Sequence, residues 1–191
     1  TESFEIFKKK LKDALVDWYT YTPGENYHYF SWYPNWGSFM GYNTRDNENP
    51  GIDLLQDHAF CYAYHIYAAS ILFMYDKEFM NKYKDFTKMM VRDYANWDRN
   101  YTALPWFRSM DPWNGHSFSG GVGDFNGNGQ ESSSEAMQAW GAMFMFGSVT
   151  NDKEVRDAAI FGYVQEAQAI GEYWFDRSHI PANGGVGNYD Y

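Results

Sequence analysis

Two long runs of apolar and aromatic residues constrain the fold of this chain more than any other feature. Residues 54–75 and 131–149 are apolar almost all the way round a helix, and both runs are too long for strands. After a tight turn, each is followed by a helix with one apolar face, over 77–97 and from Asp152 to about Trp174. This alternation predicts an all-α fold in which amphipathic helices cover buried ones.

Apolar side chains also recur at helical spacing near the start of the chain, which predicts an amphipathic helix over 3–18. Its apolar stripe consists of Phe4, Phe7, Leu11 and Leu15. The helix over 77–97 has a similar stripe, made of Phe79, Met80, Tyr83, Phe86, Met90 and Tyr94.

Concentric inner and outer helices are the plan of an α/α barrel, in which long loops gather where the inner helices begin. Residues 19–52 and 99–130 are two such loops, rich in Gly and aromatic residues, and we expect them to build a cleft. Closing six helix pairs needs roughly twice this length. We therefore expect residues 1–191 to form one domain, which is part of an (α/α)6-barrel-type catalytic domain.

Composition and net charge narrow the classes of molecule that the chain is expected to bind. The formal net charge of −10 disfavours nucleic acid and anionic membranes, whereas a neutral polymer is not disfavoured. Aromatic residues make up 21% of the chain, which fits either a surface that stacks on sugars or a large aromatic core. No stretch is typical of a signal peptide or a membrane span.

Three acidic residues are the candidates for catalysis. Asp57 lies near the start of the first apolar helix, while Glu131 and Glu135 open the second and, being four apart, share a face. An aromatic setting raises the pKa of a carboxyl group, and glycoside hydrolysis needs one such acid and one carboxylate. The alternative is that these acids only complement helix dipoles, which is weakest for Asp57 inside its apolar run.

A calcium loop is a competing interpretation of the stretch before Glu135. The spacing of an EF-hand loop is matched by Asp124, Asn126, Asn128, Gly129 and Glu135. The residues before this stretch cannot form the leading helix, and Glu131 occupies a position that is normally apolar. We therefore expect tight turns here, and no metal.

Histidine and cysteine chemistry is sparse. His58 and His65 lie seven apart on one helix face without an evident third ligand, so hydrogen-bonded core histidines are expected rather than a zinc site. The single cysteine, Cys61, lies in an apolar run and is expected to be a buried small residue rather than a nucleophile.

Two segments resemble glycoside hydrolase family 81, the endo-β-1,3-glucanases. The first is "DPWNGHSFSGGVGDFNGNGQESSSEAMQAWGAM", in which the matching positions are Asp111, Pro112, Gly115, His116, Ser117 and residues 130–136. The second is "LLQDHAFCYAYHIYAASIL", in which they are Asp57, His58, Phe60, Tyr62, Tyr64, Ala68 and Ala69. The resemblance extends over about residues 30–190. Complete family members also carry a β-sandwich and a linker domain, which this chain would lack.

The resemblance implies hydrolysis of internal β-1,3-glucosidic bonds with inversion of configuration. It makes Asp57 the general acid and Glu131 the general base, with Glu135 as its assisting neighbour. No cofactor is implied, because inversion uses two carboxylates and one water molecule. It also implies an extracellular, secreted enzyme whose partner is β-1,3-glucan.

Substrate contacts are expected from five further residues. Trp36 and Trp113 lie in the long loops, where they either stack on sugar rings or pack the loops down. His58, Tyr64 and His116 lie in the segments that resemble the family. The competing class is a β-glucan-binding module, or an inactive fragment of such an enzyme, that keeps the cleft without turnover.

Overall fold

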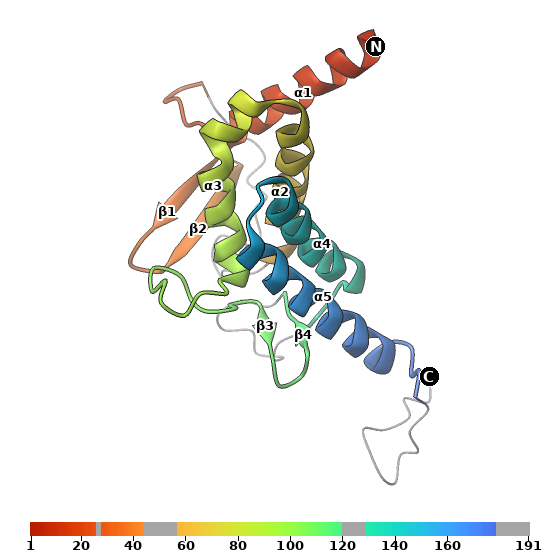
Figure 1. Ribbon diagram of the computed structural model, residues 1–191. Coiled ribbons are helices and arrows are strands. Elements are labelled where there is room, and N and C mark those ends of the chain that lie inside the picture. The colour runs from red at the N-terminus through yellow and green to blue at the C-terminus, as the bar shows by residue number, and fades with distance from the viewer. Residues whose placement is uncertain (26–27, 44–56, 120–128, 179–191) are drawn as a thin grey trace.

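The computed structural model describes residues 1–25, 28–43, 57–119 and 129–178 (Figure 1). This part of the chain is mostly helical. Its helices are α1 (Glu2–Tyr19), α2 (His58–Tyr75), α3 (Lys77–Ala95), α4 (Ser133–Val149) and α5 (Lys153–Tyr173). Its strands are β1 (His28–Tyr33), β2 (Ser38–Asn43), β3 (Met110–Asp111) and β4 (His116–Ser117).

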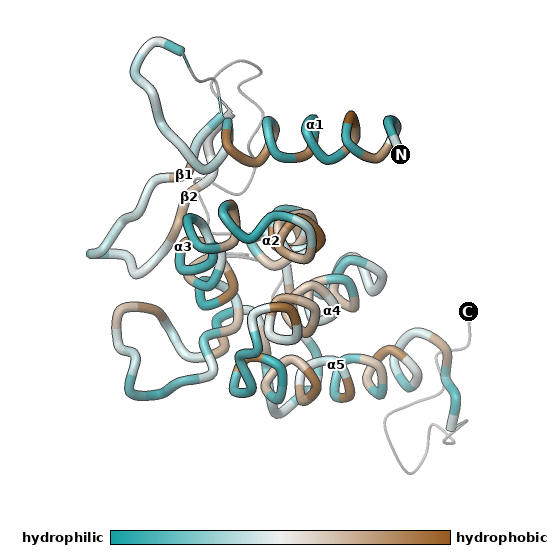
Figure 2. The backbone as a smooth tube through the Cα atoms, turned by 45° about the horizontal axis from the view of Figure 1, so that its top comes forward, coloured by the Kyte–Doolittle hydropathy of each residue, from teal (hydrophilic) through white to brown (hydrophobic). Residues whose placement is uncertain are grey.

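The two apolar helices, α2 and α4, pack against each other at the centre of the molecule. Each is covered by the amphipathic helix that follows it in sequence, since α3 packs on α2 and α5 packs on α4. Figure 2 shows the resulting order, with α1 on one side of α2 and α5 on the far side of α4. The expected pairing of a buried with an amphipathic helix therefore occurs twice.

Aspartate caps begin both covering helices. The Asp76 carboxylate accepts the backbone N–H of Phe79 at 2.8 Å, and the Asp152 carboxylate accepts that of Val155 at 3.3 Å. The Asp76 carboxylate also binds the Lys12 ammonium at 2.7 Å, which ties α1 to the α2–α3 turn. This hydrogen bond lowers the pKa of Asp76.

The apolar helices begin later than the sequence predicts. The first begins at His58, with Asp57 as its N-cap, and the second begins at Ser133. Residues 54–56 lie outside the described residues. Asp57 and Glu131 are therefore not helical residues, because both have a left-handed backbone with φ of 58°.

The two long loops contain short antiparallel strand pairs, which corrects the all-α expectation to a mostly helical fold. β1 pairs with β2 from His28–Asn43 to Tyr33–Ser38, and β3 pairs with β4 (Figure 1). Gly37 closes the β1–β2 turn with φ of 55°, and an added Cβ there would lie 2.8 Å from the carbonyl oxygen of Ala103. The first hairpin thus packs closely on the loop after α3.

Large side chains fill the core between the helices. The largest fully buried ones are Trp140, Tyr94, Phe73, Phe79 and Phe146. Gly162 on α5 lies against the Trp140 ring, and a Cβ at that position would overlap the ring. The close packing of α4 on α5 therefore depends on this glycine.

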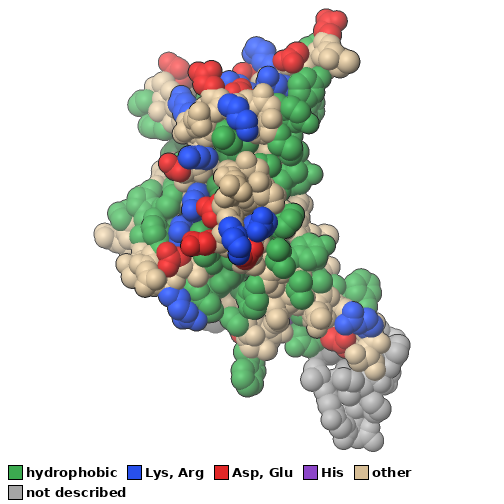
Figure 3. Space-filling model, in the orientation of Figure 1, with side chains coloured by type: hydrophobic (Ala, Val, Ile, Leu, Met, Phe, Trp, Pro, Cys, Tyr) green, Lys and Arg blue, Asp and Glu red, His purple; other side chains and the backbone are tan. Residues whose placement is uncertain are grey.

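Several apolar side chains remain exposed. Phe7 on α1 is 67% exposed, so this residue of the predicted stripe is not packed into the core. Shallow apolar grooves run between α2 and α4 and between α4 and α5, lined by Tyr67, Met74, Phe144, Ile160, Tyr163 and Val164. On the face drawn in Figure 3, charged side chains of both signs are interspersed with apolar ones. Within the described ranges, no helix has the combination of length and apolar character needed to cross a membrane.

Candidate active site

Asp57 lies at the entrance to α2 with its side chain free of any capping role. It is the N-cap residue, yet its carboxylate makes no capping hydrogen bond. Its backbone N–H donates to the carbonyl oxygen of Ser119 at 3.0 Å, which joins the start of α2 to the segment after β4. A left-handed aspartate held in this way satisfies its backbone while leaving the carboxyl group available for chemistry.

Glu131 lies just before α4, so it does not share a helix face with Glu135 as expected. Ser132 is the N-cap of α4, and its hydroxyl accepts the backbone N–H of Glu135 at 3.3 Å. The Glu131 carboxylate accepts a hydrogen bond from the hydroxyl of Ser119 at 3.2 Å. Ser119 therefore contacts Asp57 through its backbone and Glu131 through its side chain.

Glu135 occupies the first turn of α4 and faces α2. Its carboxylate accepts the hydroxyl of Tyr64 at 3.0 Å across the interface between the two helices. This hydrogen bond raises the pKa of Tyr64. The structure thus places Tyr64, which is half exposed, against one of the candidate carboxylates.

The three candidate acids influence one another electrostatically. Burial raises the pKa of Asp57 above its ordinary value of 3.8, and the negative charges of Glu131 and Glu135 raise it further. His58 acts in the opposite direction. An acid that only complemented a helix dipole would have a lowered pKa, so burial and like charges outweigh the dipole at Asp57.

His58 is buried, which conflicts with its expected role in substrate binding. Only 4% of its side chain is exposed, and its Nδ1 contacts the carboxylate of Asp93 at 2.5 Å. Asp93 is itself fully buried and also accepts hydrogen bonds from the Ser38 hydroxyl at 3.1 Å and the Phe39 backbone N–H at 2.9 Å. Arg108 approaches the same carboxylate at 3.6 Å. His58 therefore stabilises the start of α2 through a buried contact with Asp93.

The β3–β4 turn carries the most exposed aromatic side chain of the candidate site. Trp113 is 94% exposed, and the carboxylate of Asp111 accepts its backbone N–H at 2.9 Å. His116 at the base of this turn packs edge-on against Tyr173, with the ring centroids 5.7 Å apart. Trp36 lies at the tip of the other hairpin, stacked on Tyr33.

A second buried acid, Glu166 on α5, was not found from the sequence. It is fully buried and accepts the backbone N–H of Ser117 at 2.7 Å, the indole N–H of Trp140 at 3.1 Å and the side-chain amide of Gln130. Asp93 was missed as well, and both acids lie on the buried side of an amphipathic helix. A carboxylate on the buried stripe of an amphipathic helix is the signal that marks both.

Cys61 is exposed, so the expectation of a buried residue is wrong. The pKa of its thiol is raised by desolvation and by the negative charges of Asp57 and Glu135. A raised pKa leaves little thiolate, so the environment disfavours a nucleophilic role.

The proposed calcium ligands Asp124, Asn126 and Asn128 lie outside the described residues. Among the residues that are described, no three His, Cys, Asp or Glu side chains come together as a metal site would require. The ring Nδ1–H of His65 donates to the Cys61 carbonyl oxygen at 3.0 Å, and the ring packs edge-on against Trp18. Burial lowers its pKa.

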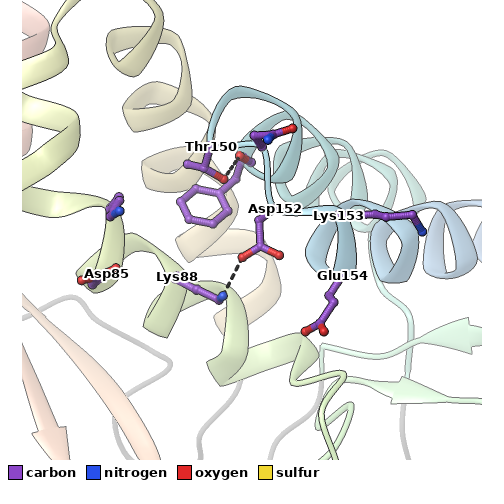
Figure 4. A pocket seen from close by; sticks show the side chains of 9 residues that line it. Asp85, Lys88, Thr150, Asp152, Lys153 and Glu154 are labelled. Atoms are coloured by element: carbon purple, nitrogen blue, oxygen red, sulfur yellow. Dashed lines mark hydrogen bonds and ion pairs between the residues drawn. The ribbon is translucent and has the colours of Figure 1, made fainter.

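A separate charged depression lies at the opposite end of α4 (Figure 4). It is formed by α3 and the α4–α5 turn, and the ion pair between Lys88 and Asp152, 2.6 Å apart, crosses it. Because α4 has 17 residues, this depression is about 25 Å from the start of the helix. The depression is lined by three lysines and three acidic residues, so its charge favours neither an anionic nor a cationic ligand.

Comparison with known proteins gives consistent matches. The family model described as "Glycosyl hydrolase family 81 C-terminal domain" matches residues 2–183. A glucan endo-1,3-beta-D-glucosidase of Acetivibrio thermocellus is 38% identical over 169 residues, which cover 87% of this chain and 22% of the relative. A protein of the same name from Thermobifida fusca is 33% identical over 168 residues, covering 86% of this chain and 22% of the relative.

A solved structure is similar as well. It is a mutant of a glycoside hydrolase family 81 protein from Clostridium thermocellum, with a TM-score of 0.82 and 36% identity. The match covers 90% of this chain and 24% of the solved one. The chain thus spans about a fifth to a quarter of the length of these relatives.

Proposed function

The chain belongs to glycosyl hydrolase family 81, and we propose that it supplies the acid and base groups that hydrolyse internal β-1,3-glucosidic bonds. The names of its relatives support this substrate, since they are called glucan endo-1,3-beta-D-glucosidases. The chain spans only part of those relatives, so this activity is proposed for the site that the chain carries.

The observation that carries the proposal is that Ser119 joins Asp57 and Glu131, through its carbonyl oxygen and its hydroxyl respectively, so that the two candidate acids lie together. Burial and the nearby charges of Glu131 and Glu135 keep this carboxyl group protonated to a higher pH than an ordinary aspartate. A general acid must hold a proton while its partner is ionised. Asp57 lies at the start of α2 and Glu131 just before α4, and these two helices pack together.

In the proposed reaction, Asp57 donates its proton to the glycosidic oxygen as the bond to the anomeric carbon breaks. Glu131 accepts a proton from a water molecule, whose oxygen forms the new bond on the opposite face of the sugar. The configuration at the anomeric carbon is inverted. Glu135, which binds Tyr64, acts beside Glu131 by adding negative charge.

Aromatic side chains of the chain would hold the glucan. Trp113 exposes a flat apolar surface at the β3–β4 turn, which suits stacking on the C–H face of a glucose ring. Tyr64, His116 and Trp36 remain candidates for further contacts. No cofactor enters the proposed reaction, since both proton transfers use side chains of this chain.

We also propose that the described helices form one domain, 1–191, that is part of an (α/α)6 barrel. The concentric order of α2 and α4 inside α3 and α5 supports this arrangement, as does the match to about a quarter of a family 81 structure. The exposed apolar side chains along α2, α4 and α5 are those that neighbouring inner and outer helices of a barrel would cover. We also propose an extracellular location, as the family resemblance implies.

Release of reducing ends from laminarin and curdlan tests the proposal, with cellulose and chitin as controls. We expect short β-1,3-linked oligosaccharides and no products from the controls. The second candidate is a β-glucan-binding module without turnover, for which the exposed Trp113 side chain offers a stacking surface. That candidate predicts retardation of the protein in laminarin-containing gels without release of reducing ends. Faster cleavage of a β-1,4-glucan contradicts both.

A further inference from the structure

Glu131 adopts a backbone conformation that its neighbours must impose. Its φ is 58°, in the left-handed region that a glutamate rarely occupies. A non-glycine residue persists there only when its surroundings determine the conformation. The residue before it, Gln130, has only 7% of its surface exposed, although glutamine is ordinarily a surface residue.

The Gln130 side chain is locked by partners on both of its polar atoms. Its amide N–H donates to the carboxylate of Glu166, and its amide oxygen accepts the indole N–H of Trp174. Both partners lie on or at the end of α5, far from Gln130 in sequence. The backbone at position 130 is therefore anchored to α5 rather than to α4, the helix it precedes.

Glu166 is suited to act as this anchor because all three of its partners are N–H donors. Its Oε2 accepts the N–H groups of Ser117 and Trp140, and its Oε1 accepts the amide of Gln130. The three partners come from β4, from α4 and from the segment before Glu131. A single buried carboxylate thus joins the elements that surround the candidate base.

We propose that Glu166 is a positioning residue, which holds Glu131 toward Asp57 through the Gln130 side chain. The kinetic consequence of this inference rests on the proposed function, whereas the placement of Glu131 does not. The alternative is that Glu166 serves only to accept the hydrogen bond of the buried Trp140 indole N–H. The two accounts differ in whether loss of the Glu166–Gln130 contact changes the surroundings of Asp57.

The test variant is Glu166→Gln, which keeps the volume of the side chain. Its remaining oxygen can still accept the N–H groups of Ser117 and Trp140. The new amide group, however, meets the amide N–H of Gln130, and two donors cannot pair. The substitution therefore breaks the contact to Gln130 selectively. Trp140→Phe is the matched control, because it removes another donor to Glu166 and leaves the Gln130 contact in place.

Two readouts separate this proposal from the proposed function. The first is the pKa of the Asp57 carboxyl group, measured by carbon-detected NMR titration of the chain. Since the charge of Glu131 raises this pKa, displacement of Glu131 lowers it. The second is the division of any laminarin hydrolysis into kcat and KM. Misplacing the base should lower kcat on the order of 10–100-fold with little change in KM.

We expect Glu166→Gln to lower the pKa of Asp57 and kcat, and Trp140→Phe to leave both unchanged. An unchanged Asp57 titration in folded Glu166→Gln overturns the inference. If the unmodified chain shows no turnover, the proposed function fails, while the titration still decides the role of Glu166. Should Glu166→Gln not fold, Gln130→Met removes the same contact from the other side, and the same fall in the Asp57 pKa is required of it.

Discussion

The imidazole Nδ1 of His58 lies 2.5 Å from the carboxylate of Asp93, and both side chains are buried. His58 directly follows Asp57, the candidate general acid, so this pair anchors the first residue of α2. Asp93 on α3 also accepts hydrogen bonds from Ser38 and Phe39 at the start of β2. One buried carboxylate thus connects α2, α3 and the first hairpin.

Replacing Asp93 should therefore be among the most damaging single changes in the chain. Asp93→Ala leaves His58, the Phe39 N–H and Arg108 without their shared buried acceptor, and we expect a loss of about 3–5 kcal/mol in the free energy of unfolding. Asp85→Ala on the exposed face of α3 is the control, with an expected change within about 0.5 kcal/mol. Urea denaturation measures both. A similar small loss for the two variants contradicts the role of Asp93.

Asp57→Asn should raise the stability of the chain at pH 7 and lower its activity. The folded pKa of Asp57 is raised, so the stability it contributes is present below its unfolded pKa and is lost as pH rises through the folded pKa. Asparagine carries no charge and tolerates the left-handed backbone at this position. We expect a higher Tm than that of the unmodified chain at pH 7 and no such gain near pH 3.

The same substitution removes the proposed proton donor. Loss of a general acid lowers turnover by about 10²–10⁴-fold, so laminarin hydrolysis should fall by that factor. Thermal melts at pH 7 and near pH 3 check the predicted stability, and reducing-end assays check the predicted loss of turnover. A lower Tm at pH 7 contradicts the electrostatic account, and retained turnover contradicts the assignment of the acid.

The pH profile of hydrolysis should depend on Glu135. Its negative charge helps to raise the pKa of Asp57, which sets the alkaline limb of the profile because the acid must be protonated. Glu135→Gln removes that charge and should move the alkaline limb to lower pH. Glu172→Gln, on the last turn of α5, is the control and should leave the limb in place. A limb that stays fixed, or moves to higher pH, in Glu135→Gln contradicts this coupling.

Trp113→Ala should weaken glucan binding with little effect on stability. The side chain is 94% exposed, so its loss should change the free energy of unfolding by at most about 0.5 kcal/mol. If the indole stacks on a sugar ring, mobility in laminarin-containing gels will increase toward that in plain gels. Phe7→Ala, which removes an exposed ring from α1, is the control for non-specific effects. A large loss of stability with normal retardation would mark Trp113 as structural.

Helix periodicity predicted most of the described fold because it is a local signal. The helices expected over 3–18 and 77–97 are present as α1 and α3, and the helix expected from Asp152 is present as α5, with Asp152 as its N-cap. The starts of α2 and α4 were misplaced because an apolar run does not reveal where helical backbone begins. For α4 the missed signal was Ser132, whose hydroxyl caps the helix.

Features that depend on distant partners were not predictable in this way. The β1–β2 hairpin was hidden in an aromatic loop, although six-residue segments rich in Tyr, Phe and Trp flank a turn that ends in Gly37. The roles of Asp93 and Glu166 depend on hydrogen-bond partners 26–55 positions away. The sequence pattern made Asp57, Glu131 and Glu135 the candidate acids and the family resemblance implied their roles, while the structure adds that the first two lie outside the helices.

In the proposed function, Asp57 and Glu131 form an inverting acid and base pair. Proton NMR of laminarioligosaccharide hydrolysis, recorded from the first turnovers and before mutarotation, tests it most directly. Inversion of a β-linkage predicts that the α-anomer of the new reducing end appears first, and that Glu131→Gln abolishes its formation while binding remains. First appearance of the β-anomer, or unchanged turnover by Glu131→Gln, would rule out Asp57 and Glu131 as an inverting pair.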